Sequence, residues 1–97
     1  MNNMRPIHPG EILKEEYLEP LGMSVNALAT ALRISAPRIN DVVRQKRAVS
    51  VDTALRLARY FNTTAQFWLN LQTSYDLKAA QESIIAIEEE ILPLQAA

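Results

Sequence analysis

The chain has 97 residues, of which 48% are hydrophobic and 22% charged, with a formal net charge of −1 and no cysteine. This composition is typical of one globular domain, and the missing thiols exclude disulfides, thiolate metal sites and cysteine nucleophiles. No apolar run is long enough to span a membrane, and the first residues lack the apolar segment of a signal peptide. We therefore expect a cytoplasmic protein with no membrane partner.

Residues 1–6 are expected to form a loose N-terminal arm. Pro9-Gly10 then opens the first helix, because proline is tolerated in a first turn whose N–H groups have no partner within the helix. We expect this helix to continue to about Leu18 and to stop at Pro20 and Gly22, since both residue types interrupt helices.

His8 is the only histidine and stands directly before this helix. It has no second histidine, cysteine or carboxylate cluster at the spacing of metal ligands, and no partner for acid–base catalysis. We interpret it as a capping or surface residue, and we expect neither a metal nor another cofactor.

Two short amphipathic helices follow, joined by a tight turn. The first covers about residues 24–32 with Ser24 as its N-cap, and the second opens at Ser35, where Pro37 fits the first turn. Their apolar residues follow helical spacing: Val25, Leu28, Ala29 and Leu32, then Ile39, Val42 and Val43. A turn of about three residues makes the helices cross steeply and leaves the polar face of the second helix projecting. This pattern is typical of a helix-turn-helix, whose second helix lies in the major groove of DNA.

Basic residues gather around this unit. Between Arg33 and Arg59 seven basic residues stand against two acids, a local charge of +5, whereas three basic residues and nine acids give the remainder −6. We call residues 33–59 the basic sector. Lys and Arg that displace counterions supply most of the sequence-independent affinity for DNA, so the sector favours a nucleic-acid partner.

Two further helices are expected after a basic loop at residues 45–49. Ser50 caps a helix over residues 51–61, and Thr64 caps a helix that begins at Ala65. In the first, Arg56 and Arg59 are expected to face outward, and the residues expected to face the core are Val51, Ala54, Leu55, Ala58 and Phe61. In the second, Trp68 is expected to lock the helix onto the others, within a stripe of Phe67, Trp68, Leu71 and Tyr75.

Residues 77–97 are expected to form a C-terminal helix with a different pattern. Its apolar residues recur at intervals of three and four, as in a helix that pairs with another: Leu77, Ala80, Ile84, Ile87, Ile91 and Leu94. This stripe either packs on its own domain or meets a second chain. Ile85 and Leu92 add more apolar surface than one small domain covers, which favours dimerisation or contact with a different partner. The predicted contact residues are Leu77, Ile84, Ile87 and Ile91.

Several segments together resemble the HigA antitoxins, the VapI-type branch of the Xre-like repressors. The resemblance covers about residues 5–80 and rests on residues 7–18, 28–29, 46–50, 53–58, 67–72 and 75–77. The helix-turn-helix portion is shared by many repressors. The Pro9-Gly10 opening combined with Phe67-Trp68-Leu69-Asn70-Leu71-Gln72 is far more discriminating. Residues from about 81 onward lie outside the resemblance.

The resemblance implies a five-helix repressor-like helix-turn-helix domain over residues 7–76. With the additional C-terminal helix that the apolar periodicity predicts, the expected fold is all-α. It implies a homodimer that binds double-stranded operator DNA and represses its own operon. It also implies a co-encoded toxin partner, a HigB-like ribosome-dependent mRNA endonuclease. Two positions that are often glycine in these repressors depart from the pattern: Arg33 in the turn and Gln45 after the second helix.

The family's recognition geometry, transferred to this chain, identifies the candidate DNA-binding residues. Those nearest the base edges are Ala36, Pro37, Arg38 and Asp41; those near the groove wall or backbone are Asn40 and Arg44; and those expected at phosphates are Lys46 and Arg47. Arg38 is the strongest candidate for base reading, because a guanidinium donates two hydrogen bonds to O6 and N7 of guanine. The alternative for Arg38 is a phosphate contact.

The predicted function is therefore that of an antitoxin in a type II toxin–antitoxin pair. The alternative is a stand-alone helix-turn-helix transcriptional repressor without a toxin partner. An enzyme is not expected, because the chain has no histidine pair, phosphate-cradling glycine loop or nucleophile motif. A basic toxin would be steered by acidic faces, which lie at residues 11–19 or 82–90.

Overall fold

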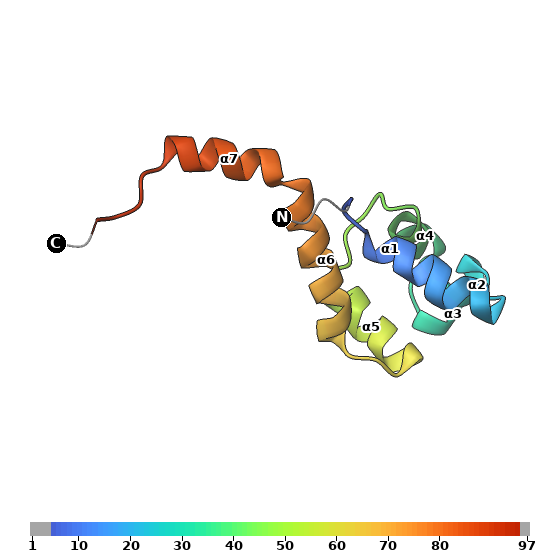
Figure 1. Cartoon of the computed structure of the whole chain (residues 1–97). Helices are drawn as coiled ribbons and strands as arrows, with labels where there is room; N and C mark the ends of the chain where they lie inside the picture. Colours follow the sequence, from blue (N-terminus) through green and yellow to red (C-terminus); the bar gives the residue numbers. More distant parts are fainter. Residues whose placement is uncertain (1–4, 96–97) are drawn as a thin grey trace.

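The computed structural model describes residues 5–95, and over this range the chain is all-α without a strand (Figure 1). Its helices are α1 (Pro9–Ile12), the π-helical segment η1 (Leu13–Leu18), α2 (Glu19–Leu21), α3 (Val25–Leu32), α4 (Ala36–Val43), α5 (Val51–Phe61), α6 (Ala65–Ala79) and α7 (Gln81–Glu90). The first three segments join through helical backbone and form one continuous helix. The described part therefore has the predicted five helices of the domain and the additional C-terminal one.

The first helix runs beyond Leu18, and the prediction that Pro20 stops it was wrong. Between Leu13 and Leu18 the helix widens to π geometry, and the Glu19 N–H donates to the carbonyl of Lys14, five residues back. In an α-helix the proline ring would clash with the carbonyl four residues before it, and the wider turn relieves this clash. The helix ends at Gly22, whose φ of 61° is in the left-handed region that glycine adopts without strain.

Arg5, within the predicted loose arm, forms an ion pair with the first helix. Its guanidinium donates to both carboxylate oxygens of Glu11, with Nη1–Oε1 and Nη2–Oε2 distances of 2.9 and 2.7 Å. An ion pair on an exposed side chain does not decide whether the backbone of the arm is loose, so the loose arm over residues 1–6 stays a prediction. The rest of the predicted arm, residues 1–4, lies outside the described residues.

His8 caps the first helix, as predicted, but it is buried and not on the surface. Its Nδ1 accepts a 2.8 Å hydrogen bond from the Gly10 N–H, and its ring meets Tyr75 edge-on with centroids 4.9 Å apart. Burial lowers the pKa of His8, while the backbone of Arg47 and the charge of Asp76 act in the opposite direction. The cap needs an unprotonated Nδ1, so the neutral ring is the form that fits the fold.

Trp68 lies in the core, as predicted from the sequence. Its side chain is fully buried, its ring centroid lies 5.3 Å from that of Tyr17, and its Nε1–H donates to Thr63 Oγ1 at 2.9 Å. Leu13, Leu28, Ile39 and Leu57 are also fully buried, so α3 to α6 and the first helix all contribute to one core.

The inward face of α5 differs from the prediction. Ala54, Ala58 and Phe61 face the core as predicted. Val51 and Leu55, also predicted to face it, are exposed by 60% and 56%, and the unpredicted Leu57 is fully buried. Both the buried residues and the predicted residues recur at helical spacing, so the pattern fits two neighbouring faces of α5 equally well. The packing of α5 against α6 and α3 decides which face is covered, and periodicity alone cannot.

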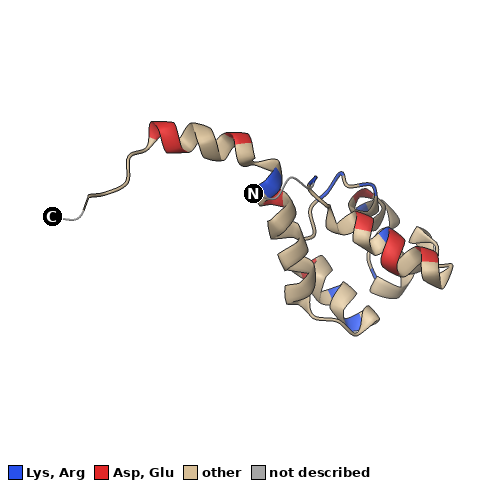
Figure 2. Cartoon of the chain, in the orientation of Figure 1, with Lys and Arg blue, Asp and Glu red and all other residues tan. Residues whose placement is uncertain are grey.

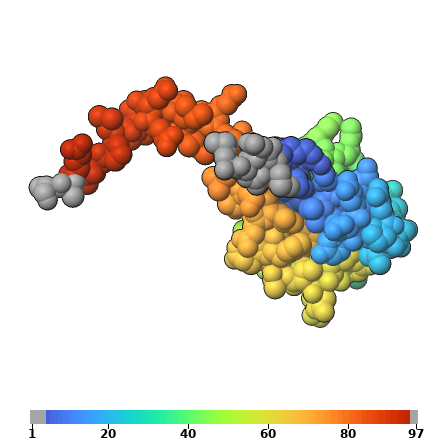
Figure 3. Space-filling model, in the orientation of Figure 1, coloured from blue at the N-terminus to red at the C-terminus, as the bar shows by residue number. Residues whose placement is uncertain are grey.

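The C-terminal region is also not the single helix predicted over residues 77–97. The chain leaves α6 at Ala79, bends at Ala80, forms α7 and continues without helix from Ile91 to Gln95. All described residues from Gln81 onward are exposed, and α7 projects from the domain, giving extents of 57 × 26 × 21 Å (Figure 3). The apolar stripe therefore does not pack on its own domain.

Candidate nucleic-acid interface

The helix-turn-helix has the predicted capped ends. Ser24 Oγ accepts from the Ala27 N–H at 3.0 Å at the start of α3, and Ser35 Oγ accepts from the Arg38 N–H at 3.4 Å at the start of α4. The end of α3 at Leu32 and the start of α4 at Ala36 leave a turn of residues 33–35 between the helices. Ile39 and Val42 anchor α4 in the core, so its polar face is held at the surface.

The turn contains no glycine, and Arg33, at a position that is often glycine in the repressors that the chain resembles, has a left-handed conformation. Its φ and ψ are 61° and 41°, and its N–H closes the end of α3. A non-glycine residue in this conformation costs about 1 kcal/mol. Arg56 of α5 reaches back to the turn and donates to the carbonyls of Leu32 and Arg33 at 2.8 and 3.4 Å. These bonds satisfy carbonyls that the helix end leaves without partners.

A basic loop follows α4 and lies beside it. Gln45 also has a positive φ, 64°, and turns the chain so that the Lys46 N–H donates to the Asp41 carbonyl at 2.8 Å. The side chains of Lys46 and Arg47 are exposed, and Arg47 Nη2 lies 3.5 Å from Asp41 Oδ2. Figure 2 shows the cations of this loop beside α4, which packs against the start of the first helix.

The structure brings most of the predicted DNA-binding residues to one surface. Ala36 and Pro37 start α4, Asn40 and Asp41 follow on its partly exposed face, and Arg44 is the exposed C-cap that leads into the loop with Lys46 and Arg47. This arrangement combines a projecting helix with adjacent cations, as readout of a groove and its phosphates requires.

Arg38 is the exception, because its side chain already has partners within the protein. Its Nη2 donates to Asp52 Oδ2 at 2.6 Å and to Thr53 Oγ1 at 2.8 Å, and the side chain is only 27% exposed. The sequence did not predict these contacts, which compete with base reading for the same N–H groups of Arg38. They join the first turn of α4 to the first turn of α5.

Asp52 is a functional candidate that the sequence reasoning missed. Its Oδ2 accepts from Arg38 and also from Arg56 Nε, at 2.9 Å, and these two hydrogen bonds hold the pKa of the carboxyl below its usual range. Arg56, expected to face outward, in fact turns toward the end of α3. The spacing of four residues between Asp52 and Arg56 was the available signal for their pairing.

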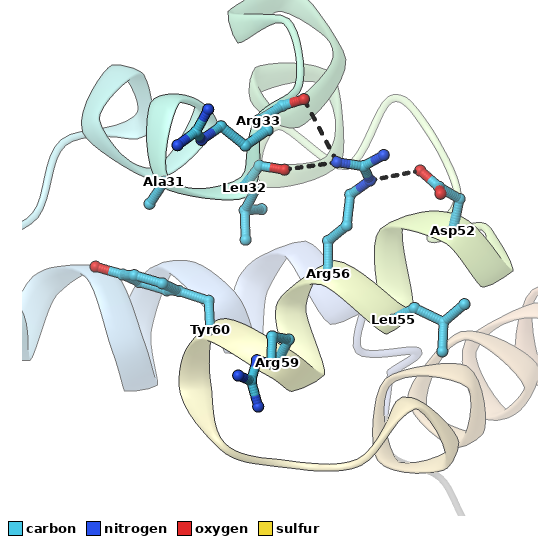
Figure 4. A pocket seen from close by; sticks show the side chains of 8 residues that line it. All are labelled: Ala31, Leu32, Arg33, Asp52, Leu55, Arg56, Arg59 and Tyr60. Atoms are coloured by element: carbon cyan, nitrogen blue, oxygen red, sulfur yellow. Dashed lines mark hydrogen bonds and ion pairs between the residues drawn. The ribbon is translucent and has the colours of Figure 1, made fainter.

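These groups border an open pocket of about 650 Å³ between the end of α3 and α5 (Figure 4). Leu55, Arg59 and Tyr60 of α5 also line it, and Arg56 joins its two walls through hydrogen bonds to Asp52 and to the Leu32 carbonyl. Within residues 5–95 no group of His, Asp or Glu side chains is arranged to hold a metal ion. No helix in the same range is both long and apolar enough to cross a membrane.

Comparison with known proteins identifies the same region. Residues 14–68 match the family model described as helix-turn-helix, HTH_3. The chain is 57% identical over 93 residues to virulence-associated protein I of Dichelobacter nodosus, covering 96% of this chain and 85% of that protein. Among solved structures, Pseudomonas aeruginosa antitoxin HigA with the higBA promoter is 54% identical, with a TM-score of 0.88 over 94% of this chain and 100% of that one. Antitoxin GraA is 47% identical, with a TM-score of 0.91 over 95% and 100% of the two chains.

Proposed function

The chain belongs to the HigA antitoxins of the helix-turn-helix family, and on this basis we propose that it binds operator DNA in its own promoter and neutralises a co-encoded toxin. The observation that carries the DNA-binding part is structural. The capped start of α4 and the exposed cations of the following loop lie on one surface. Proteins of this family are DNA-binding regulators, not enzymes.

In the proposed complex, α4 enters the major groove and the loop contacts phosphates. Ala36, Pro37 and Asp41 then lie nearest the base edges, with Asn40 and Arg44 at the groove wall and Lys46 and Arg47 at the backbone. The methyl group of Ala36 is suited to contact a thymine methyl. Arg38 is not assigned to a base here, because its guanidinium already donates to Asp52 and Thr53 within the protein.

A gel-shift titration tests this proposal. The parent chain is titrated against its promoter fragment and against random DNA of the same length, at two salt concentrations. We expect tighter binding to the promoter, which should contain an inverted repeat, and weaker binding at higher salt. Equal affinity for promoter and random DNA would reject operator recognition.

A homodimer is proposed because the C-terminal apolar stripe has no cover in the single chain. Leu77, Ile84, Ile87 and Ile91 are exposed by 59%, 41%, 51% and 62%. A contiguous apolar surface of this kind favours association with another chain. If two copies dock side by side on DNA, the centres of their half-sites should lie about 34–36 Å, or one helical turn, apart.

The proposed protein partner is a HigB-like mRNA endonuclease encoded beside this chain. An enzyme that holds RNA carries positive charge, and the chain offers two acidic surfaces outside the basic sector (Figure 2). One is the first helix with Glu11, Glu15, Glu16 and Glu19, and the other is α7 with Glu82 and Glu88–90. Such charge steers association with a basic toxin.

Co-expression with the neighbouring gene distinguishes this function from that of a stand-alone repressor. We expect the neighbour to arrest growth when expressed alone and to lose this effect when the present chain is co-expressed. A harmless neighbour, or toxicity that persists beside the folded chain, would leave operator binding as the only function. That outcome would favour the stand-alone repressor.

A further inference from the structure

We propose that Asp52 and Arg38 are positioning residues for DNA recognition, and that Arg38 does not read a base. This inference rests on the proposed binding of operator DNA by α4. It concerns how the start of α4 is held relative to α3 and α5 before DNA arrives.

Three hydrogen bonds connect the three helices in series. Arg38 of α4 donates to Asp52 Oδ2 at 2.6 Å, and Arg56 donates to the same oxygen at 2.9 Å. Arg56 also donates to the Leu32 carbonyl at the end of α3, at 2.8 Å (Figure 4). The Asp52 carboxylate therefore links the first turn of α4 to the glycine-free turn that precedes it.

The chemistry of the guanidinium argues against a second role for Arg38 in bidentate base reading. A guanidinium presents two pairs of parallel N–H bonds, one from Nε and Nη2 and one from Nη1 and Nη2. Nη2 belongs to both pairs, and its two hydrogens are directed to Asp52 and Thr53. Bidentate donation to guanine would therefore break at least one of these bonds.

The sign of the charge on Asp52 makes the inference testable. A carboxylate within the basic sector repels phosphates, so its removal should strengthen DNA binding if charge were its only effect. If Asp52 positions α4, its removal weakens operator binding despite the gain in positive charge. The two readings therefore predict opposite changes.

The first experiment measures the affinity of Asp52→Asn for the operator and for random DNA by fluorescence anisotropy of labelled DNA. We expect operator affinity to fall about tenfold, and affinity for random DNA to stay equal or rise. Glu19→Gln removes an exposed acid outside the network and serves as the charge-matched control, with operator affinity at least that of the parent. Operator affinity of Asp52→Asn equal to or above that of the parent would overturn the proposal.

The second experiment tests Arg38 against single base-pair changes across the operator. Arg38→Ala should lose affinity for every operator variant by a similar factor, and the double variant Arg38→Ala/Asp52→Asn should bind about as weakly as Arg38→Ala alone, because the two residues act as a unit. Loss of preference at one G·C pair in Arg38→Ala, with unchanged preference elsewhere, would show that Arg38 reads that base and would reject the positioning role.

A third readout needs no DNA and separates this inference from the proposed function. Amide hydrogen exchange at residues 33–38 reports local opening of the turn and of the start of α4. We expect faster exchange there in Asp52→Asn, with core amides of α6 unchanged. Unchanged exchange at residues 33–38 would reject the positioning role, whereas failure of the parent to prefer its operator would reject only the proposed function.

Discussion

Gln72 Oε1 accepts a 2.8 Å hydrogen bond from the backbone N–H of Val49, across 23 residues of sequence. Gln72 is 7% exposed, and its Nε2 donates to Asp76 Oδ1 at 2.9 Å, which fixes the orientation of the amide. The contact attaches the end of the basic loop to α6. Part of the motif over residues 67–72 thus stabilises the loop that carries Lys46 and Arg47.

Replacement of Gln72 by alanine should loosen this loop. The buried Val49 N–H would lose its partner, which costs about 1–3 kcal/mol, and binding should weaken for operator and random DNA alike. Urea denaturation and anisotropy titrations measure the two effects. Gln66→Ala is the control, because Gln66 bonds Asn70 on the exposed side of the same helix. Equal stability of the two variants would contradict the assigned role.

Lys46→Ala should weaken binding to all DNA sequences and lower the slope of log affinity against log salt by about one. The reason is the loss of one exposed cation beside α4. Lys78→Ala removes a cation from α6, outside the basic sector, and should leave the slope unchanged. A loss confined to the operator would place Lys46 at a base and not at a phosphate.

The two glycines should respond differently to alanine. A Cβ on Gly10 would lie 1.9 Å from the Val42 carbonyl oxygen, so the first helix and α4 must separate. Such overpacking costs about 1–3 kcal/mol, and operator binding should fall because α4 moves. Gly22→Ala meets no atom within 4 Å and should cost only the left-handed strain, about 1 kcal/mol. Thermal unfolding of both variants tests this order, and the reverse order would contradict the close approach at Gly10.

His8 should make stability depend on pH near neutrality. Its pKa is lowered in the folded chain, so the unfolded chain takes up this proton first as the pH falls. The contribution of neutral His8 to the stability of the fold is complete above the ordinary pKa of 6.5. It is lost as the pH falls through the lowered pKa of the folded chain. His8→Asn keeps a capping acceptor without a titrating group. Melting temperatures between about pH 5 and 7.5 should therefore vary less in this variant; the same variation in both proteins would assign it to other groups.

Ile87→Glu should separate the proposed dimer while leaving the domain folded. Ile87 is 51% exposed, and no residue of α7 is buried, so the new charge meets no core in the single chain. Sedimentation velocity measures the mass, and circular dichroism measures the fold. Glu89→Gln alters charge on the other side of α7 and should remain dimeric. A dimer that survives Ile87→Glu would locate the contact elsewhere.

Local contacts were predictable from the sequence, and contacts between distant residues were not. The caps Ser24, Ser35, Ser50 and Thr64 all accept from a backbone N–H three residues later, so short sequence windows contain them. The burial of Trp68 followed from its size and apolar surroundings.

The remaining features depend on tertiary structure. The partners of Arg38 lie 14 and 15 residues away, and helical periodicity does not reveal such pairs. Exposure of Val51 and Leu55 depends on which face of α5 meets its neighbours. The π geometry before Pro20 is a backbone adjustment with no residue pattern of its own.

Trp68 provides an intrinsic optical signal, since it is the single tryptophan of the chain. Its indole is shielded from water in the folded state and packs beside Tyr17 and Phe67. Unfolding transfers it to water, so the emission maximum moves to longer wavelength as the core opens. Every variant above therefore carries an unlabelled fluorescence reporter of folding, read in the same cuvette as the anisotropy of labelled DNA.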